Sequence, residues 1–280
     1  MQPIQSRFMA VLAFAGAALC AFPAHAQAQT YPDRPVTIIV PFAPGGGVDT
    51  MARLMAEKMR PALGQSVIVQ NKPGASGMLG AQYVADAKPD GYTLLLGSAG
   101  ETSINAYVYK KSMRYSPSKD LAPVTLVTRV PNVLVAGPSL QAANVGELIQ
   151  YAKAHPDAVS YAGAASFIQD GRVRALAVTS PKRASFAKDI PALAEFEGLS
   201  GYNLENWFGL FVPAGTPPAV VERLNQAATE VLRDPELVQR LRDQGGEPAP
   251  MTPKEFADFI QKESVQYRKI IEDANITVDG

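Results

Sequence analysis

The chain has 280 residues with 26 basic and 26 acidic side chains, so its formal net charge is zero. It has no basic stripe with interleaved aromatic residues, and we expect no binding to nucleic acid. One cysteine and two histidines exclude cysteine-rich metal sites and leave too few ligands for an ordinary zinc site, so we expect no cofactor. The length suits one large domain or two small ones.

The first 26 residues have the features of a secretory signal peptide. Arg7 precedes a run of small apolar residues, and Ala24-His25-Ala26 fits the small-x-small cleavage pattern. Cleavage is predicted after Ala26, with Ala28 as the second choice, and it would remove Cys20, the only cysteine. No later apolar run is long enough to cross a bilayer, so we expect an exported, periplasmic protein.

The first element after the signal is a strand that leads into a helix through glycines. The β-branched run 36–40 stops at Pro41, passes through Gly45-Gly46-Gly47 and opens a helix predicted over 48–59. The first N–H groups of a helix have no intrahelical partner, and glycines let a ligand approach the backbone. The segment therefore predicts a site for an anion such as a carboxylate or phosphate. A tight turn without any ligand is the alternative.

Two more units of the same kind follow. A strand over 66–70 leads through a loop at 71–77 into a helix over 78–87, and a strand over 92–96 ends in the loop Gly97-Ser98-Ala99-Gly100. Three successive units predict a parallel sheet with helices on both faces. Because ligands of such sheets lie beyond the carboxyl ends of the strands, all three loops are expected at one binding edge.

The rest of the chain alternates between strands and helices. Residues 121–135 are strand-rich with a break at Pro131-Asn132. His155 is expected to cap a helix C-terminus and Trp207 to lie in the core. The helices near the C-terminus begin with proline signals and carry an apolar stripe. The further predicted elements are helices over 145–154, 219–233, 235–244 and 253–274, and strands over 159–162, 171–178 and 207–212.

The order of these segments resembles the periplasmic substrate-binding receptors of tripartite tricarboxylate transporters, the Bordetella uptake gene (Bug-type) receptors. The matching phrases span nearly all of the chain after the signal, and each is modest alone but the set is specific. They are Tyr31-Pro32-Asp33-Arg34-Pro35-Val36, Pro41-Phe42-Ala43-Pro44-Gly45-Gly46, Asn71-Lys72-Pro73-Gly74-Ala75, Asp90-Gly91-Tyr92-Thr93-Leu94, Pro131-Asn132-Val133-Leu134-Val135, Arg174-Ala175-Leu176-Ala177-Val178-Thr179, and Trp207-Phe208-Gly209-Leu210-Phe211 before Pro213-Ala214-Gly215-Thr216-Pro217.

The resemblance implies an α/β fold of the type II periplasmic-binding-protein kind, with two lobes of parallel or mixed sheets. Lobe 1 would comprise residues 27–124 and 211–280, and lobe 2 residues 125–210. Members of the family bind citrate-like acids, dicarboxylates, acidic amino acids or aromatic acids. By resemblance, the ligand carboxylate is held at the first strand–helix loop and its neighbours, which places these residues at the site: Phe42, Ala43, Pro44, Gly45, Gly46, Asp49, Ser76, Gly77, Ser98 and Ala99.

Asp49 has two interpretations. As an N-cap or first-turn carboxylate, it would be favoured by the positive end of the helix. If instead it lines the cleft, it would repel a second ligand carboxylate and favour an ammonium group, as in an acidic amino acid. The sequence leaves both open.

One region departs from the family. Members of the family carry a serine- and threonine-rich loop, a helix and a strand in this region. In this chain, residues Ala165 to Gly171 connect the segments on either side directly, so a few dozen residues of lobe 2 are missing. Micromolar binding needs about 8 kcal/mol. One lobe, with a helix N-terminus and a few charged hydrogen bonds, could supply about half of that. We therefore expect a truncated second lobe and impaired capture.

Three functions compete. The leading prediction is a monomeric receptor that passes a small organic acid or acidic amino acid to membrane transporter subunits. The alternative is a partner-binding or signalling protein, acting on a membrane protein or sensor kinase without tight solute binding. An enzyme is not expected, because the chain lacks Gly-x-Gly-x-x-Gly, a following Gly-Lys-Ser/Thr, a Gly-x-Ser-x-Gly elbow and any carboxylate pair of catalytic spacing.

Overall fold

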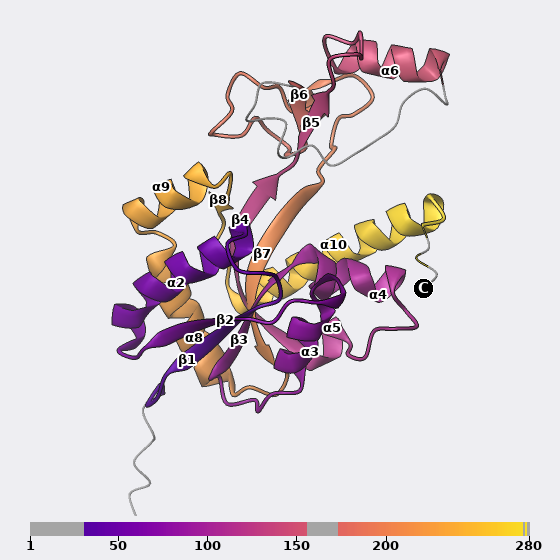
Figure 1. Ribbon diagram of the computed structural model, residues 1–280. Helices are drawn as coiled ribbons and strands as arrows, with labels where there is room; N and C mark the ends of the chain where they lie inside the picture. The colour runs from indigo at the N-terminus through magenta and orange to yellow at the C-terminus, as the bar shows by residue number, and fades with distance from the viewer. Residues whose placement is uncertain (1–30, 156–172, 277, 279–280) are drawn as a thin grey trace, which may run out of the picture. The chain divides into compact units, whose positions relative to one another are not determined.

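A computed structural model describes residues 31–155, 173–276 and 278. Its larger sheet has six strands in the order β2-β1-β3-β7-β4-β8 (Figure 1). Strands β1 and β2, and β1 and β3, are parallel, as predicted, whereas β7 runs antiparallel to both β3 and β4. The sheet is therefore mixed. The strands are β1 (Val36–Val40), β2 (Val67–Asn71), β3 (Thr93–Ser98), β4 (Leu121–Pro131), β7 (Glu205–Pro213) and β8 (Glu247–Pro248).

Helices cover both faces of this sheet. On one face α2 (Gly47–Leu63) packs against β2 and α8 (Pro218–Val231), with α9 (Pro235–Asp243) beside them. On the other face lie α3 (Met78–Ala85) and α10 (Pro253–Asp273), which share one apolar cluster (Figure 1). Short turns follow β3: η3 (Gly100–Ile104), α4 (Asn105–Val108) and α5 (Pro117–Asp120).

The core confirms the apolar stripes predicted for the helices. The methionine-rich face of α2 is buried, with Met55 and Met59 fully inaccessible. Trp207 is also fully buried, as expected, and meets the Phe256 ring edge to face at a centroid distance of 5.7 Å. Helix α10 begins with a capping box formed by Thr252 and Glu255. On the same helix Ile270 is 40% exposed, whereas Ile271 packs against the core cluster, so Ile270 alone departs from the predicted stripe.

A second, two-stranded sheet consists of β5 (Val133–Ala136) and β6 (Arg174–Val178), which are antiparallel. The predicted break before β5 is present at Asn132, because β4 ends at Pro131. Helix α6 (Val145–Ala154) packs with this sheet, and His155 caps it by donating Nδ1–H to the Tyr151 carbonyl at 3.1 Å. Small apolar clusters, together with η4 (Leu193–Glu195), form the core around it.

Strands β4 and β7 pair along their whole lengths, from Leu121 opposite Pro213 to Pro131 opposite Glu205. The lobe boundaries expected after residues 124 and 210 therefore fall inside two paired strands, and their positions stay a prediction. The predicted signal peptide, the strand 159–162 and the join at 165–171 lie outside the described residues. Within residues 31–155 and 173–276, no helix combines the length and apolar character that a membrane crossing requires.

Candidate functional site

The first strand–helix loop exposes backbone at the N-terminus of α2. Residues Ala43 to Gly47 are exposed, and Phe42 is half-buried. Gly46 is the N-cap, with φ −77° and ψ 169°, and no side chain caps it. Gly45 has φ +85°, a conformation that glycine adopts without strain. Because the first N–H groups of a helix lack intrahelical partners, this loop offers donors at the positive end of the macrodipole.

Asp49 lies in the first turn of α2 and is buried. Its Oδ2 accepts hydrogen bonds from Gly45 N at 2.9 Å and Arg53 Nε at 3.0 Å, while Oδ1 accepts from Arg53 Nη2 at 3.0 Å and Asn71 Nδ2 at 2.9 Å. The hydrogen bond from Arg53 is the main reason that the pKa of Asp49 falls to about 2. Both carboxylate oxygens thus have two donors each, which favours the first-turn interpretation over ligand contact.

Asn71 joins the first loop to the second. It is the last residue of β2, in register with Val40 at the end of β1. Its Nδ2 donates to the Phe42 carbonyl at 3.1 Å as well as to Asp49. The sequence predicted a loop at this position but no bridging side chain, because the acceptors lie on other elements. An asparagine directly after a strand was the only signal.

The second loop has a left-handed backbone over four residues. Gly74, Ala75, Ser76 and Gly77 all have positive φ, and Ala75 and Ser76 have side chains, for which this region costs about 1–2 kcal/mol per residue. Asn105 Nδ2 donates to the Ser76 carbonyl at 3.0 Å, which helps to hold this conformation. Such strain, where surrounding contacts enforce it, is typical of ligand clamps.

Gly77 is where the three loops meet. A Cβ built on Gly77 would lie 3.1 Å from Glu101 Oε2 and 3.3 Å from Phe42 Cζ. A side chain here would crowd both groups, and the φ of +85° at Gly77 also favours glycine. The structure therefore brings Phe42, Gly77 and the third loop together at the carboxyl edge of β1, β2 and β3, where the sequence predicted convergence.

Directly after the third loop, in η3, lies a carboxyl group that was not among the predicted site residues. Ser98 and Ala99 are buried, and Ser98 donates from N at 2.5 Å and from Oγ at 2.6 Å to the two carboxyl oxygens of Glu101. Glu101 is fully inaccessible, and burial raises its pKa to about 7. A glutamate directly after a small-residue loop was the available signal, but its burial depends on the packing of Gly77 and Gly97 against it.

The ten predicted site residues therefore fall into two groups. The first group lies at the junction of the loops or is buried beside it, and consists of Phe42, Gly77, Ser98 and Ala99 together with Asp49, which binds the backbone of the first loop. The other five are exposed on the first and second loops: Ala43, Pro44, Gly45, Gly46 and Ser76. Their contact with a ligand stays a prediction.

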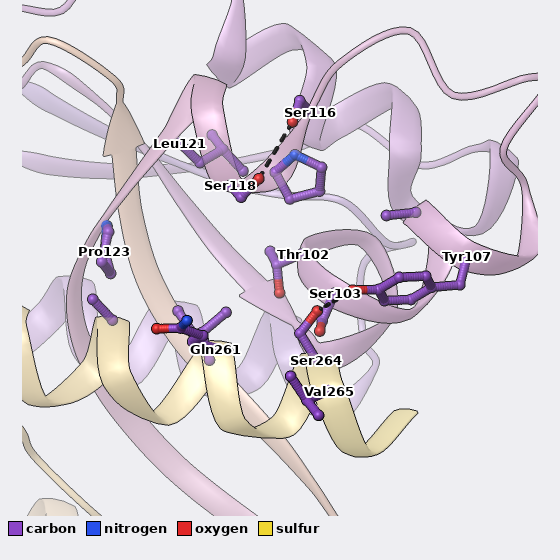
Figure 2. Close-up of a pocket in the computed structure, with 14 residues that line it drawn as sticks. Thr102, Ser103, Tyr107, Ser116, Ser118, Leu121, Pro123, Gln261, Ser264 and Val265 are labelled. Atoms are coloured by element: carbon purple, nitrogen blue, oxygen red, sulfur yellow. Dashed lines mark hydrogen bonds between the residues drawn. The ribbon is translucent and has the colours of Figure 1, made fainter. Parts of the chain in front are cut away.

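A separate hollow of about 450 Å³ lies between α10 and the segments η3, α4 and α5. Figure 2 shows hydroxyl groups around it, including Tyr107 and Ser264, whose oxygens are 2.7 Å apart. None of the fourteen residues that line it is charged. An ionised carboxylate would be poorly compensated there, so this hollow is less suited to an anion than the loop junction.

The mixed sheet, its helices and the loops at its carboxyl edge define the class of protein: a type II periplasmic-binding-protein-like α/β protein. The sequence matches the tripartite tricarboxylate transporter family receptor over residues 51–167 and 162–276, and the chain belongs to this family. The family is one of substrate-binding receptors rather than enzymes. The two matched segments overlap at residues 162–167, which include the start of the join, from residue 165, where the sequence predicts that residues are missing.

Three solved structures are similar to this chain. The periplasmic binding protein BugD is 31% identical, with a TM-score of 0.73, and the match covers 89% of this chain and all of BugD. The Rhodopseudomonas palustris protein Rpa4515, solved with adipate, is 30% identical with a TM-score of 0.76 and the same coverages. MatC from the same organism, solved with bound malate, is 29% identical with a TM-score of 0.72, over 86% of this chain and all of MatC.

Relatives of known sequence are longer than this chain in the matched region. Six of them align over 296 to 326 residues, whereas the whole chain has 280. Each alignment therefore contains positions for which this chain has no residue. This agrees with the truncated second lobe predicted from the sequence.

Proposed function

We propose that this protein is an extracytoplasmic receptor that binds a small carboxylate and delivers it to a transporter of the tripartite tricarboxylate type. The observation that carries the proposal is the junction of three loops at the carboxyl edge of the sheet, where the uncapped N-terminus of α2 faces solvent. Adipate and malate, the acids with which two similar proteins were solved, are both dicarboxylates.

The proposed contacts follow from the chemistry of the loops. Backbone N–H groups at residues 46–48 are the proposed donors to one ligand carboxylate, aided by the helix macrodipole. Phe42 and Gly77 would form the wall beside it, and Ser76 and Ser98 would offer further polar groups. Asp49 is proposed as a support: it fixes Gly45 and binds Arg53, so that the exposed amides keep their orientation.

Binding is proposed to be weak. We place the positions missing from this chain in the region assigned to lobe 2, so that this lobe would supply few of its ligand contacts. The remaining lobe could contribute about 4 kcal/mol from a helix N-terminus and one or two charged hydrogen bonds. This corresponds to a dissociation constant of about 1 mM.

The remaining parts of the proposal concern processing and partners. Residues 1–26 would be removed as a signal peptide on export to the periplasm. Residues 27–124 and 211–280 would form one lobe, and residues 125–210 the truncated other lobe. The receptor would act as a monomer, without enzymatic activity, and would meet the membrane subunits of its transporter in the loaded state.

Isothermal titration calorimetry of the protein lacking residues 1–26 tests this function. The panel contains adipate, malate, citrate and glutamate, and adipamide serves as the uncharged control for adipate. We expect at least one acid to bind with a dissociation constant near 1 mM while adipamide does not bind. A micromolar constant would uphold the receptor and contradict the weak capture.

Absence of heat for every acid, up to about 10 mM, would overturn carboxylate binding. In that case, capture of the protein by membranes that contain the transporter, with or without acids, would favour the partner-binding alternative. If the membranes captured the protein only when an acid was present, that result would instead support delivery of the acid to the transporter.

A further inference from the structure

Glu101 is a buried carboxyl group for which the proposed function has no use. Its side chain is fully inaccessible and lies at the junction of the three loops, packed against Gly77 and Gly97. Both of its oxygens accept hydrogen bonds from Ser98. A residue that only closed this space could be apolar, whereas a carboxyl group here must be either charged without a counter-ion or protonated.

Among the residues that the structure describes, no cation balances a charge on Glu101. The causes of its pKa shift are burial, which raises it, and hydrogen bonds from Ser98 and the backbone, which lower it; no lysine or arginine contributes. The titratable side chain in contact with it is Tyr115, whose hydroxyl donates to the Glu101 backbone carbonyl at 2.5 Å. Burial, and then the charge of Glu101, raises the pKa of Tyr115, so this phenol stays neutral.

Helices α10 and α5 pack against η3 and carry Glu263, Lys119 and Asp120, but none of these is among the causes of the pKa shift of Glu101. The groups in direct contact with the Glu101 carboxyl group are uncharged. Strand β3 offers Gly97 and Ser98, the second loop offers Gly77, and the first loop offers the Phe42 ring. Asp49 is the charged group of the first loop, and its oxygens are already bound to Gly45, Arg53 and Asn71. The charge state of Glu101 is therefore set by its own environment at the junction.

We propose that Glu101 couples ligand capture to proton uptake: an organic acid binds preferentially to the form of the protein in which the Glu101 carboxyl group is protonated. The inference rests on the proposed function, because it concerns an acid at the same loop junction. It assigns to Glu101 the role of a specificity and positioning residue rather than a direct ligand contact.

Two physical effects act in the same direction. An ionised Glu101 repels a ligand carboxylate held at the junction, and because Glu101 is buried this repulsion is screened less than that between two surface charges. An ionised Glu101 also accepts hydrogen bonds from both the N–H group and the hydroxyl group of Ser98. These two donors are then not available to the incoming acid. Protonation removes the repulsion and frees the Ser98 hydroxyl, because a neutral carboxyl group can donate in its turn. The pKa of about 7 places this change near physiological pH.

The coupling gives a defined pH dependence. Below the pKa of the free protein Glu101 is already protonated, and affinity is constant. Above about pH 7 each binding event must take up a proton, so the dissociation constant rises by up to about tenfold per pH unit. If Glu101 only supported the loop mechanically, the dissociation constant would not rise with pH in this way.

Calorimetry with adipate between pH 6 and 9 (about the range in which both adipate carboxyls are ionised) tests the proposal. We expect the wild-type dissociation constant to rise across this range, and the E101Q variant to bind with a constant affinity equal to or above that of the wild type at pH 8. E263Q is the matched control: Glu263 on α10 is also buried with a raised pKa, and its replacement should leave the slope unchanged.

A second measurement needs no variant. Titration of the wild type at pH 8 in two buffers of different ionisation enthalpy gives the number of protons taken up, and we expect a value close to one per adipate. Adipate binding without proton uptake, or with the same pH slope in E101Q, would overturn the coupling and leave the receptor function standing. Failure of adipate, malate, citrate and glutamate alike to bind to any variant at any pH would overturn the receptor function first.

Discussion

Asn71 Nδ2 lies 2.9 Å from Asp49 Oδ1 and 3.1 Å from the carbonyl oxygen of Phe42. One amide group at the end of β2 thereby fixes both the carboxylate in the first turn of α2 and the backbone of the loop before it. The binding loop is held from two sides by side chains that need not touch a ligand. Its rigidity can therefore be tested apart from its chemistry.

Replacement of Asn71 by alanine removes both of these hydrogen bonds. We expect the free energy of unfolding to fall by about 1–3 kcal/mol, because each bond contributes about 1 kcal/mol and Asp49 is buried. Urea denaturation measures the change, and acid binding should weaken with it. Gln70→Ala, at the exposed neighbouring position on β2, is the control and should change stability by less than about 0.5 kcal/mol. Equal effects of the two variants would contradict the bridging role.

Gly47→Pro tests the backbone donors at the N-terminus of α2. Gly47 is the first helical residue, a position that proline favours, and Gly46 before it has the extended ψ that proline requires. The variant should fold with unchanged or greater stability but lose one N–H donor. We expect acid affinity to fall by about 10- to 100-fold, the value of one charged hydrogen bond.

The control for this variant is Gly47→Ala. It keeps the N–H group, and a Cβ at this position has no neighbour within 4 Å. Its affinity should match that of the wild type. Equal losses in both variants would indicate that the side-chain position, rather than the amide, contacts the ligand.

Gly80→Ala tests the close approach of α3 to β1. A Cβ on Gly80 would lie 2.8 Å from Pro41 Cα and 2.9 Å from the Lys72 carbonyl oxygen, and both are backbone atoms that cannot rotate away. We expect a loss of stability of about 1–3 kcal/mol, as for other overpacked sites, together with weaker acid binding because α3 carries Gly77 at its start. Thermal denaturation against Gly47→Ala separates this clash from the general effect of a glycine-to-alanine change. A stable Gly80→Ala variant would contradict the packing.

Asp49 should stabilise the fold in a pH-dependent manner. Its pKa is about 2 in the folded state against an ordinary value of 3.8, so its contribution is fully present above about pH 4 and is lost as the pH falls towards 2. The shift corresponds to about 2 kcal/mol. The difference in unfolding free energy between the wild type and Asp49→Asn should therefore shrink over this interval. A difference that is independent of pH would exclude a role for the charge.

Glu101 should act in the opposite direction and over a different interval. Its folded pKa of about 7 lies above the ordinary 4.5, so the folded state binds the proton more tightly. The contribution of the Glu101 proton to the free energy of unfolding is therefore fully present below about pH 4.5. It is lost as the pH rises through 7, and the total loss is about 3 kcal/mol. Unfolding free energies of the wild type and Glu101→Gln, measured in urea between pH 4 and 8 without ligand, should diverge across this interval. Parallel curves would show that Glu101 does not titrate there.

Local sequence patterns predict most of the elements and the edge of the sheet at which the candidate site lies. The β-branched run before Pro41, the glycines after it and the break before Val133 each predict local structure, because strand burial, left-handed turns and helix starts depend on residues near one another in the chain. The order of three such units then placed their loops at one edge, and the structure confirms that the loops meet.

The roles of the polar side chains at this edge depend instead on contacts between distant parts of the chain. Asn71 meets Asp49 across 22 positions of sequence, and Glu101 is buried against Gly77 from a different loop. The register between strands and the approach of α3 set these contacts, and neither is visible in a local pattern. For the same reason the sequence left the role of Asp49 open, since a first-turn carboxylate takes its function from the donors that the fold brings to it.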